Sequence, residues 1–145
     1  MNINNNPLNV KQGSDPWKGS TGADNRGHAI FADPADGIRA GCRILQQKWN
    51  NGKRTLLAII LEWAPVNDTQ GGLPGYPAND PADYAAYVAL RAGIGMNDPL
   101  PYLADDAALY ARIMRAMANF ETGEKCPWSF IIRGMAMWFD DFWKP

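Results

Sequence analysis

The string Asp-Pro-Ala-Asp occurs twice in the chain, at residues 33–36 and 80–83, and it constrains the fold more than any other feature. In each copy the first aspartate can cap a helix, and the proline fits the first helical turn. The second aspartate then lies near the positive end of the helix dipole. Each copy therefore predicts a helix start. We expect one helix to run to about Trp49 and the other, beginning at Pro81, to about Ala92.

Three further segments show helical patterns. Thr55 can cap a helix from Leu56 to Ala64, which is apolar nearly all round and is therefore expected at the centre of the fold. Another helix is predicted from about Ala104 to Phe120. The last runs from Trp128 to Trp143, with a break at Gly134 left open.

The remaining segments are rich in residues that form turns. Residues 1–33 are expected to be irregular with a short hairpin, in which 29–32 are the best strand material. Residues 65–79 hold six glycines and prolines and predict a loop of the length that is usually functional. Together the patterns predict a mostly α fold, one compact domain over 1–145 with a small irregular or β N-terminal part.

Composition excludes several classes of protein. With 46% hydrophobic residues and a formal net charge of −1, the chain is neither disordered nor basic enough to favour nucleic acid as a partner. No apolar run is long enough for a membrane span, and residues 1–7 lack the features of a secretory signal. A single histidine, His28, argues against a histidine-based metal site, and no cofactor motif appears. Cys42 and Cys126 predict two buried free thiols, with one disulfide as the alternative.

Glu121 is the residue that points most directly to chemistry. It lies four, seven and eleven residues after Met117, Met114 and Tyr110, so a helix would place it on an apolar stripe. A carboxyl group that is partly desolvated has a raised pKa, which is what a general acid at a glycosidic bond requires. The simpler alternative is a helix-end residue paired with Arg115 or Lys125.

The other acidic candidates have simple structural explanations. Glu62 lies in the most apolar helix and fits its polar edge, and Asp80 fits a helix start. Either would serve as a second carboxylate only if it faced Glu121 across a groove. Cys42 falls on the buried face of its predicted helix, which argues against a cysteine nucleophile.

Several short strings carry a resemblance that covers nearly the whole chain. They are Asn5–Val10, Trp17–Gly19, Trp63–Pro65, Asn79–Tyr84 and Glu121–Gly123. In this order they resemble a family of small phage and prophage virion proteins, with Pro81 where that family has threonine and an insertion over residues 66–78. The N-terminal string is also similar to part of bacterial glucosaminidases of the lysozyme superfamily. The helix that ends Glu-Thr-Gly is similar to the one on which lytic transglycosylases present their acid.

This second resemblance implies a lysozyme-like fold whose segments follow a circularly permuted order. It implies a phage-type protein that cleaves peptidoglycan glycan strands with Glu121 as general acid and without a cofactor. The groove would be lined by Asn5, Asn6, Trp17 and Tyr84. Such a protein would reside in the virion, or in the bacterial cytoplasm before release, and act in the periplasm or cell wall.

The sequence leaves two other hypotheses about function open. The first is a non-catalytic virion protein that uses the same fold for assembly or wall recognition, with other virion proteins as partners. The second is a bacterial effector that shares the chemistry and differs only in its delivery proteins.

Overall fold

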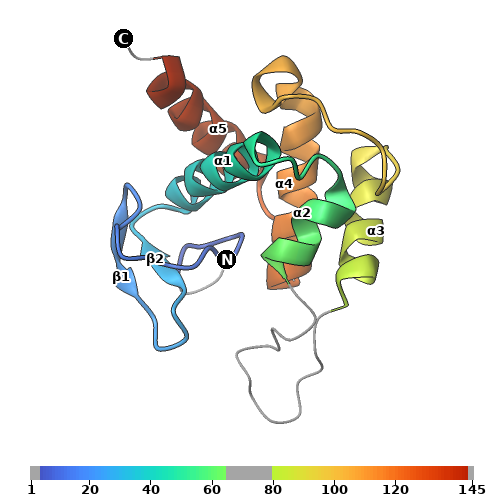
Figure 1. The fold of residues 1–145 in the computed structure, drawn as a ribbon. Helices are drawn as coiled ribbons and strands as arrows, with labels where there is room; N and C mark the ends of the chain where they lie inside the picture. The colour runs from blue at the N-terminus through green and yellow to red at the C-terminus, as the bar shows by residue number, and fades with distance from the viewer. Residues whose placement is uncertain (1–3, 65–79, 144–145) are drawn as a thin grey trace.

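The computed structural model describes residues 4–64 and 80–143, and within them the chain forms a small hairpin and five α-helices (Figure 1). The elements are β1 (Ser20–Ala23), β2 (Ala29–Phe31), α1 (Pro34–Asn50), α2 (Leu56–Trp63), α3 (Pro81–Ala92), the 3-10 turn η1 (Leu103–Asp105), α4 (Ala107–Thr122) and α5 (Trp128–Trp143). The predicted mostly α class with a small β part is confirmed. No described helix has the length and apolar character to cross a bilayer.

Both Asp-Pro-Ala-Asp strings begin helices in the predicted way. The Asp33 carboxylate accepts a hydrogen bond from the Ala35 N–H, and the Asp80 carboxylate accepts from the N–H groups of Ala82 and Asp83. Gly93 ends α3 with a left-handed φ of 79°, which a residue with a side chain rarely adopts. The local chemistry of these termini was therefore sufficient to locate α1 and α3.

Helix α2 is buried on one face only, whereas its nearly all-round apolar sequence predicted a position at the centre of the fold. Thr55 caps it as predicted, and Leu56, Ile59 and Ile60 are buried. Leu61, however, is 48% exposed. The helix packs on α3 with one face, and an apolar sequence alone does not reveal that its other face meets solvent.

Helix α4 begins later and ends later than predicted. The Asp106 carboxylate accepts from the Leu109 N–H and caps the helix, so the three residues before it form η1 instead. At the other end the helix continues through Thr122, and Gly123 takes a left-handed φ of 71°. This extension places Glu121 inside the last turn of α4.

Helix α5 is continuous through Gly134, so the break left open at this residue does not occur. A Cβ added at Gly134 would lie 2.7 Å from the carbonyl oxygen of Ala35 and would also meet Ile38. The glycine therefore lets α5 approach α1, and these two helices form the most extensive helix pair of the fold (Figure 1).

The N-terminal segment folds against the hairpin. β1 and β2 pair antiparallel, with Ser20 opposite Phe31 and Ala23 opposite Ala29. Asn6 is fully buried, and its amide donates to the carbonyl oxygens of Val10 at 2.9 Å and Ala29 at 2.8 Å. Because a buried amide without partners is costly, this pair of bonds holds residues 6–10 onto β2.

Candidate functional site

The carboxyl group of Glu121 lies at the end of the stripe that its spacing predicts. Tyr110, Met114 and Met117 are all buried, each with at most 1% of its surface exposed. Glu121 itself is half-buried in the last turn of α4. The helical periodicity therefore places this carboxyl group correctly at the border between core and surface.

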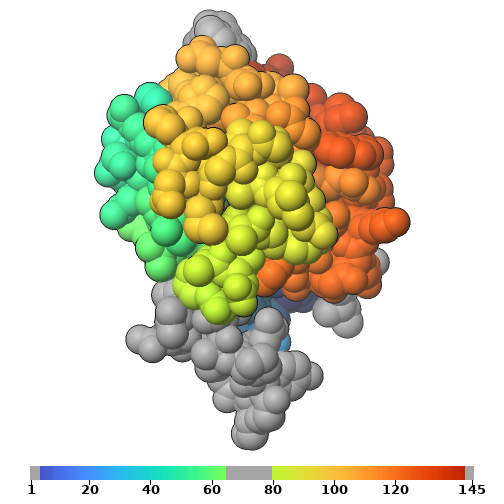
Figure 2. All heavy atoms as spheres, turned by 90° about the vertical axis from the view of Figure 1, so that its right-hand side faces the viewer, coloured from blue at the N-terminus to red at the C-terminus, as the bar shows by residue number. Residues whose placement is uncertain are grey.

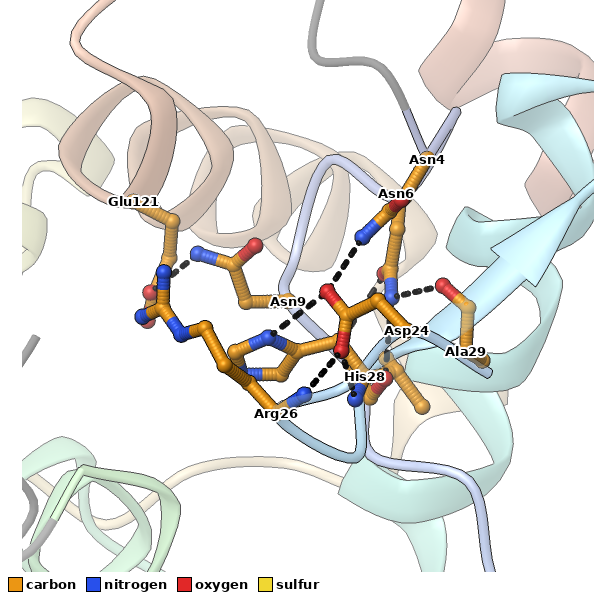
Figure 3. Close-up of polar contacts among 9 residues, drawn as sticks. Asn4, Asn6, Asn9, Asp24, Arg26, His28, Ala29 and Glu121 are labelled. Atoms are coloured by element: carbon orange, nitrogen blue, oxygen red, sulfur yellow. Dashed lines mark hydrogen bonds and ion pairs between the residues drawn. The ribbon is translucent and has the colours of Figure 1, made fainter. Parts of the chain in front are cut away.

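Two uncharged groups from distant segments donate hydrogen bonds to Glu121. The Asn9 side-chain amide donates to Oε1 at 2.9 Å, as Figure 3 shows, and the Tyr84 hydroxyl donates to Oε2 at 2.8 Å. Asn9 comes from the N-terminal segment and Tyr84 from α3. The two carboxyl oxygens are thus oriented by two separate elements.

Tyr84 is a donor that does not titrate at neutral pH. Its side chain is 1% exposed, and its ring stacks on Phe120 with centroids 4.1 Å apart. Burial raises the pKa of the Tyr84 hydroxyl well above its ordinary value, and the charge of Glu121 raises it further. The O–H therefore stays available to donate to Glu121.

Asn9 is held in place by the backbone of its own turn. It adopts a left-handed φ of 51°, which asparagine tolerates better than most residues, and its N–H donates to the Asn6 carbonyl at 3.1 Å. The neighbouring hairpin loop is fixed by Asp24, which accepts from the Asn4 amide at 2.8 Å and from the backbone N–H of His28 at 2.9 Å (Figure 3). Sequence reasoning missed Asn9, although it lies in the Asn5–Val10 string.

Two of the predicted groove residues cannot line a groove. Asn6 is 0% exposed and Tyr84 is 1% exposed, so neither offers surface to a ligand. This part of the prediction is wrong, because both side chains use their polar groups inside the fold. Asn5 is half-buried, has a left-handed φ of 50° and donates to the Phe31 carbonyl at 3.2 Å.

Trp17 lies in a different place from the groups that bind Glu121. It is partly exposed, donates to the Lys11 carbonyl at 2.9 Å and lines a hollow of about 330 Å³ between α1 and α5. Trp138 and Gln46 line the same hollow. The structure thus brings Tyr84 to Glu121 but places Trp17 at another surface.

The acidic alternatives and the proposed ion pair take other roles. Glu62 is exposed and accepts from Lys48 at 3.0 Å, which lowers the pKa of its carboxyl group. Asp80 caps α3. Arg115 donates to the Cys126 carbonyl at 2.9 Å and stacks over Trp128. Within the described residues no salt bridge joins Glu121 to Arg115 or Lys125, the two alternative partners predicted for it.

The described residues hold no group of three or more histidine, cysteine, aspartate or glutamate side chains arranged for a metal ion. Cys42 and Cys126 are both buried and free, as predicted. The site that the structure supports is therefore a single carboxyl group oriented by an amide and a phenol.

Comparison with known proteins gives one relative and no family model that matches. The chain is 34% identical over 125 residues to Protein P5 of Pseudoalteromonas phage PM2. The alignment covers 83% of this chain and 69% of that protein. It therefore includes most of both sequences, whereas the name of the relative states no chemistry.

Proposed function

We propose that this chain, which belongs to the phage protein family of Protein P5, acts on peptidoglycan and cleaves the glycan strand with Glu121 as general acid. In this proposal residues 1–145 act as one lysozyme-like domain. The protein is carried in the virion and works in the periplasm or cell wall. Asn5 remains a candidate contact to the sugars, whereas Trp17 lies at another surface.

The observation that supports this function is the way Glu121 is held. A carboxyl group that transfers a proton must keep a fixed orientation toward the reacting oxygen. Asn9 and Tyr84 provide that orientation from two sides. The helix end brings the carboxyl group to the border of the core.

A single carboxyl group is enough for one type of glycan cleavage. After taking up a proton, Glu121 would give it to the glycosidic oxygen as the bond to the sugar carbon breaks. The resulting carboxylate would then take a proton from a hydroxyl group of the sugar whose carbon has lost the glycosidic oxygen. The oxygen of that hydroxyl group bonds to this carbon and closes a second ring within the sugar. The Tyr84 hydroxyl would stabilise the carboxylate between the two steps. A hydrolytic route would need a second carboxylate, for which Asp80 and Glu62 are the candidates.

The test compares the wild type with Glu121→Gln on purified peptidoglycan and measures released muropeptides. We expect release by the wild type and a loss of at least about 100-fold in the variant, the usual contribution of a general acid. Asp105→Asn, which changes an exposed carboxyl group in η1 away from Glu121 and its two donors, is the control and should keep full activity. Equal release by wild type and Glu121→Gln would contradict the proposal.

One observation favours a second candidate, a non-catalytic virion protein. Through its two oxygens Glu121 joins the N-terminal segment to α3 and α4, which is also what a structural clamp would do. In this case the wild type releases no muropeptides from any of several wall types. Glu121→Gln would then lower the stability of the fold and the incorporation of the protein into virions.

A further inference from the structure

A basic hollow of about 740 Å³ lies between α3, α4 and the segment that joins α4 to α5. Figure 2 looks onto this face, where α3 in yellow-green lies beside the orange of α4 and the residues after it. We call it the arginine groove, and its cationic members are Arg91, Arg112, Arg115 and Lys125. Its volume is in the range of sites that hold small molecules or short peptides.

Each arginine in the groove is positioned by a backbone carbonyl. Arg91 donates to the Tyr87 carbonyl at 3.2 Å, and Arg112 donates to the Ala92 carbonyl at 3.1 Å. Arg115 donates in the same way, to Cys126. Since a guanidinium has five N–H donors, each side chain is fixed and still has donors to offer.

Aromatic rings fix two of these guanidinium groups further. Arg91 lies 3.4 Å from the centroid of the Tyr87 ring, and Arg115 lies 4.6 Å from that of Trp128. Trp128 is nevertheless 43% exposed. The groove therefore combines oriented cations with apolar surface.

The charge of the groove is out of balance. Its four cations face one acidic lining residue, Glu124, in a chain whose formal net charge is −1. None of the four cations forms a salt bridge with another residue in the described part of the chain. Arginines in such an arrangement bind carboxylate or phosphate groups with two parallel hydrogen bonds.

We propose that the arginine groove binds the carboxylates of an acidic peptide, and, resting on the proposed function, that this peptide is the stem attached to the glycan strand. Phe120 links the two places, because it lines the groove and stacks on Tyr84, which donates to Glu121. A polymer whose sugars reach Glu121 would present its peptide side groups near this helix end. The stem carries carboxylates for the arginines and aliphatic groups for the aromatic walls.

The experiment measures binding of a fluorescent disaccharide–peptide by anisotropy, in the Glu121→Gln background so that no bond is cut. The double variant Arg91→Gln/Arg112→Gln is expected to bind at least about tenfold more weakly, because charged hydrogen bonds are lost. Arg54→Gln is the matched control, since Arg54 also stacks on a ring, Trp49, and donates to its carbonyl, yet lies outside the groove. It should bind normally.

Two further ligands complete the test. The same disaccharide–peptide with amidated carboxylates should bind to the protein with intact arginines as weakly as the unmodified ligand binds to the double variant. If the amidated and unmodified ligands bind equally well to the protein with intact arginines, the proposal is overturned. Single-stranded DNA that binds more tightly with the same arginine dependence would also overturn it. Muropeptide release by the wild type is measured separately, so that failure of the proposed function can be told from failure of this inference. Arginine-dependent binding without muropeptide release contradicts only the proposed function. Muropeptide release without arginine-dependent binding contradicts only this inference.

Discussion

At the scale of single residues, the hydroxyl of Tyr84 can be removed while its ring is kept. Tyr84→Phe would retain the stack on Phe120 and delete the donor to Glu121. Because a hydrogen bond to a charged group in a part-buried site is lost, we expect the free energy of unfolding to fall by about 1.5–3 kcal/mol. Urea denaturation measures it.

The control for this change is Tyr87→Phe, one turn along α3, which keeps its ring contact with Phe120. It should alter stability by no more than about 0.5 kcal/mol. If Tyr84→Phe and Tyr87→Phe lower the free energy of unfolding by the same amount, the hydrogen bond from Tyr84 to Glu121 is not the cause of the loss.

The residue scale also shows where sequence reasoning reaches its limit. The position of Glu121 followed from its spacing to Met117, because helical periodicity is local. Its partners did not, since Asn9 and Tyr84 lie 112 and 37 positions away. The same limit misplaced Asn6, whose role depends on its contact with β2.

At the scale of helices, Gly134 tests the contact between α1 and α5. In Gly134→Ala the new Cβ would meet Ala35 and Ile38, so the helices must separate. Overpacking of this kind costs about 1–3 kcal/mol, despite the better helix propensity of alanine. Thermal and urea unfolding measure the loss. Gly13→Ala is the control, because nothing lies within 4 Å of its added Cβ; a loss of the same size there would contradict the prediction.

The same helix pair has a pH-dependent link. Asp33 caps α1 and pairs with Arg133 of α5 at 2.9 Å, and the bond from Arg133 holds the pKa of the Asp33 carboxyl below its ordinary value. A carboxyl group with a lowered pKa in the folded state stabilises the fold above its unfolded pKa of about 4, and this stabilisation is lost as pH falls through the folded pKa.

Asp33→Asn removes the ion pair with Arg133 but keeps the helix cap, because asparagine also caps helices well. The variant should be slightly less stable than the wild type at pH 7, since the pair is half-exposed, and the difference should disappear as pH falls through the lowered pKa of the Asp33 carboxyl group. Urea titrations across this range measure it. A difference that stays constant with pH would show that the ion pair is not its source.

Helix starts were predictable because capping is a local signal, as Asp33 and Asp80 show. The start of α4 was placed too early because two aspartates, Asp105 and Asp106, follow one another there, and only the fold selects Asp106 as the cap. The arginine groove was missed for a related reason. Its arginines come from two helices, and only the packing of α3 on α4 brings them together.

At the scale of the whole molecule, net charge proved a poor guide to local surface. The value of −1 describes the chain, but the arginine groove concentrates four cations on one face. The argument from net charge against nucleic acid as a partner therefore describes the average surface and not this local site. Local charge, which governs binding, depends on the tertiary arrangement.

The reactivity of the two buried thiols, Cys42 and Cys126, measures how often the protein unfolds around them. Cys42 and Cys126 are both 0% exposed, and burial raises the pKa of each, that of Cys126 to about 11. A thiol reagent should therefore react at least about 1,000-fold more slowly with the native protein than with the unfolded chain, because reaction requires opening.

If residues around both thiols unfold as one unit, Cys42→Ala and Cys126→Ala should leave single thiols that react at the same rate. Both rates should also rise with urea along the slope of global unfolding. Stopped-flow measurements with an aromatic disulfide give these rates, and guanidinium-unfolded protein gives the reference. Faster, urea-independent reaction at Cys126 would instead show that the α4–α5 connection, which forms one wall of the arginine groove, opens by itself.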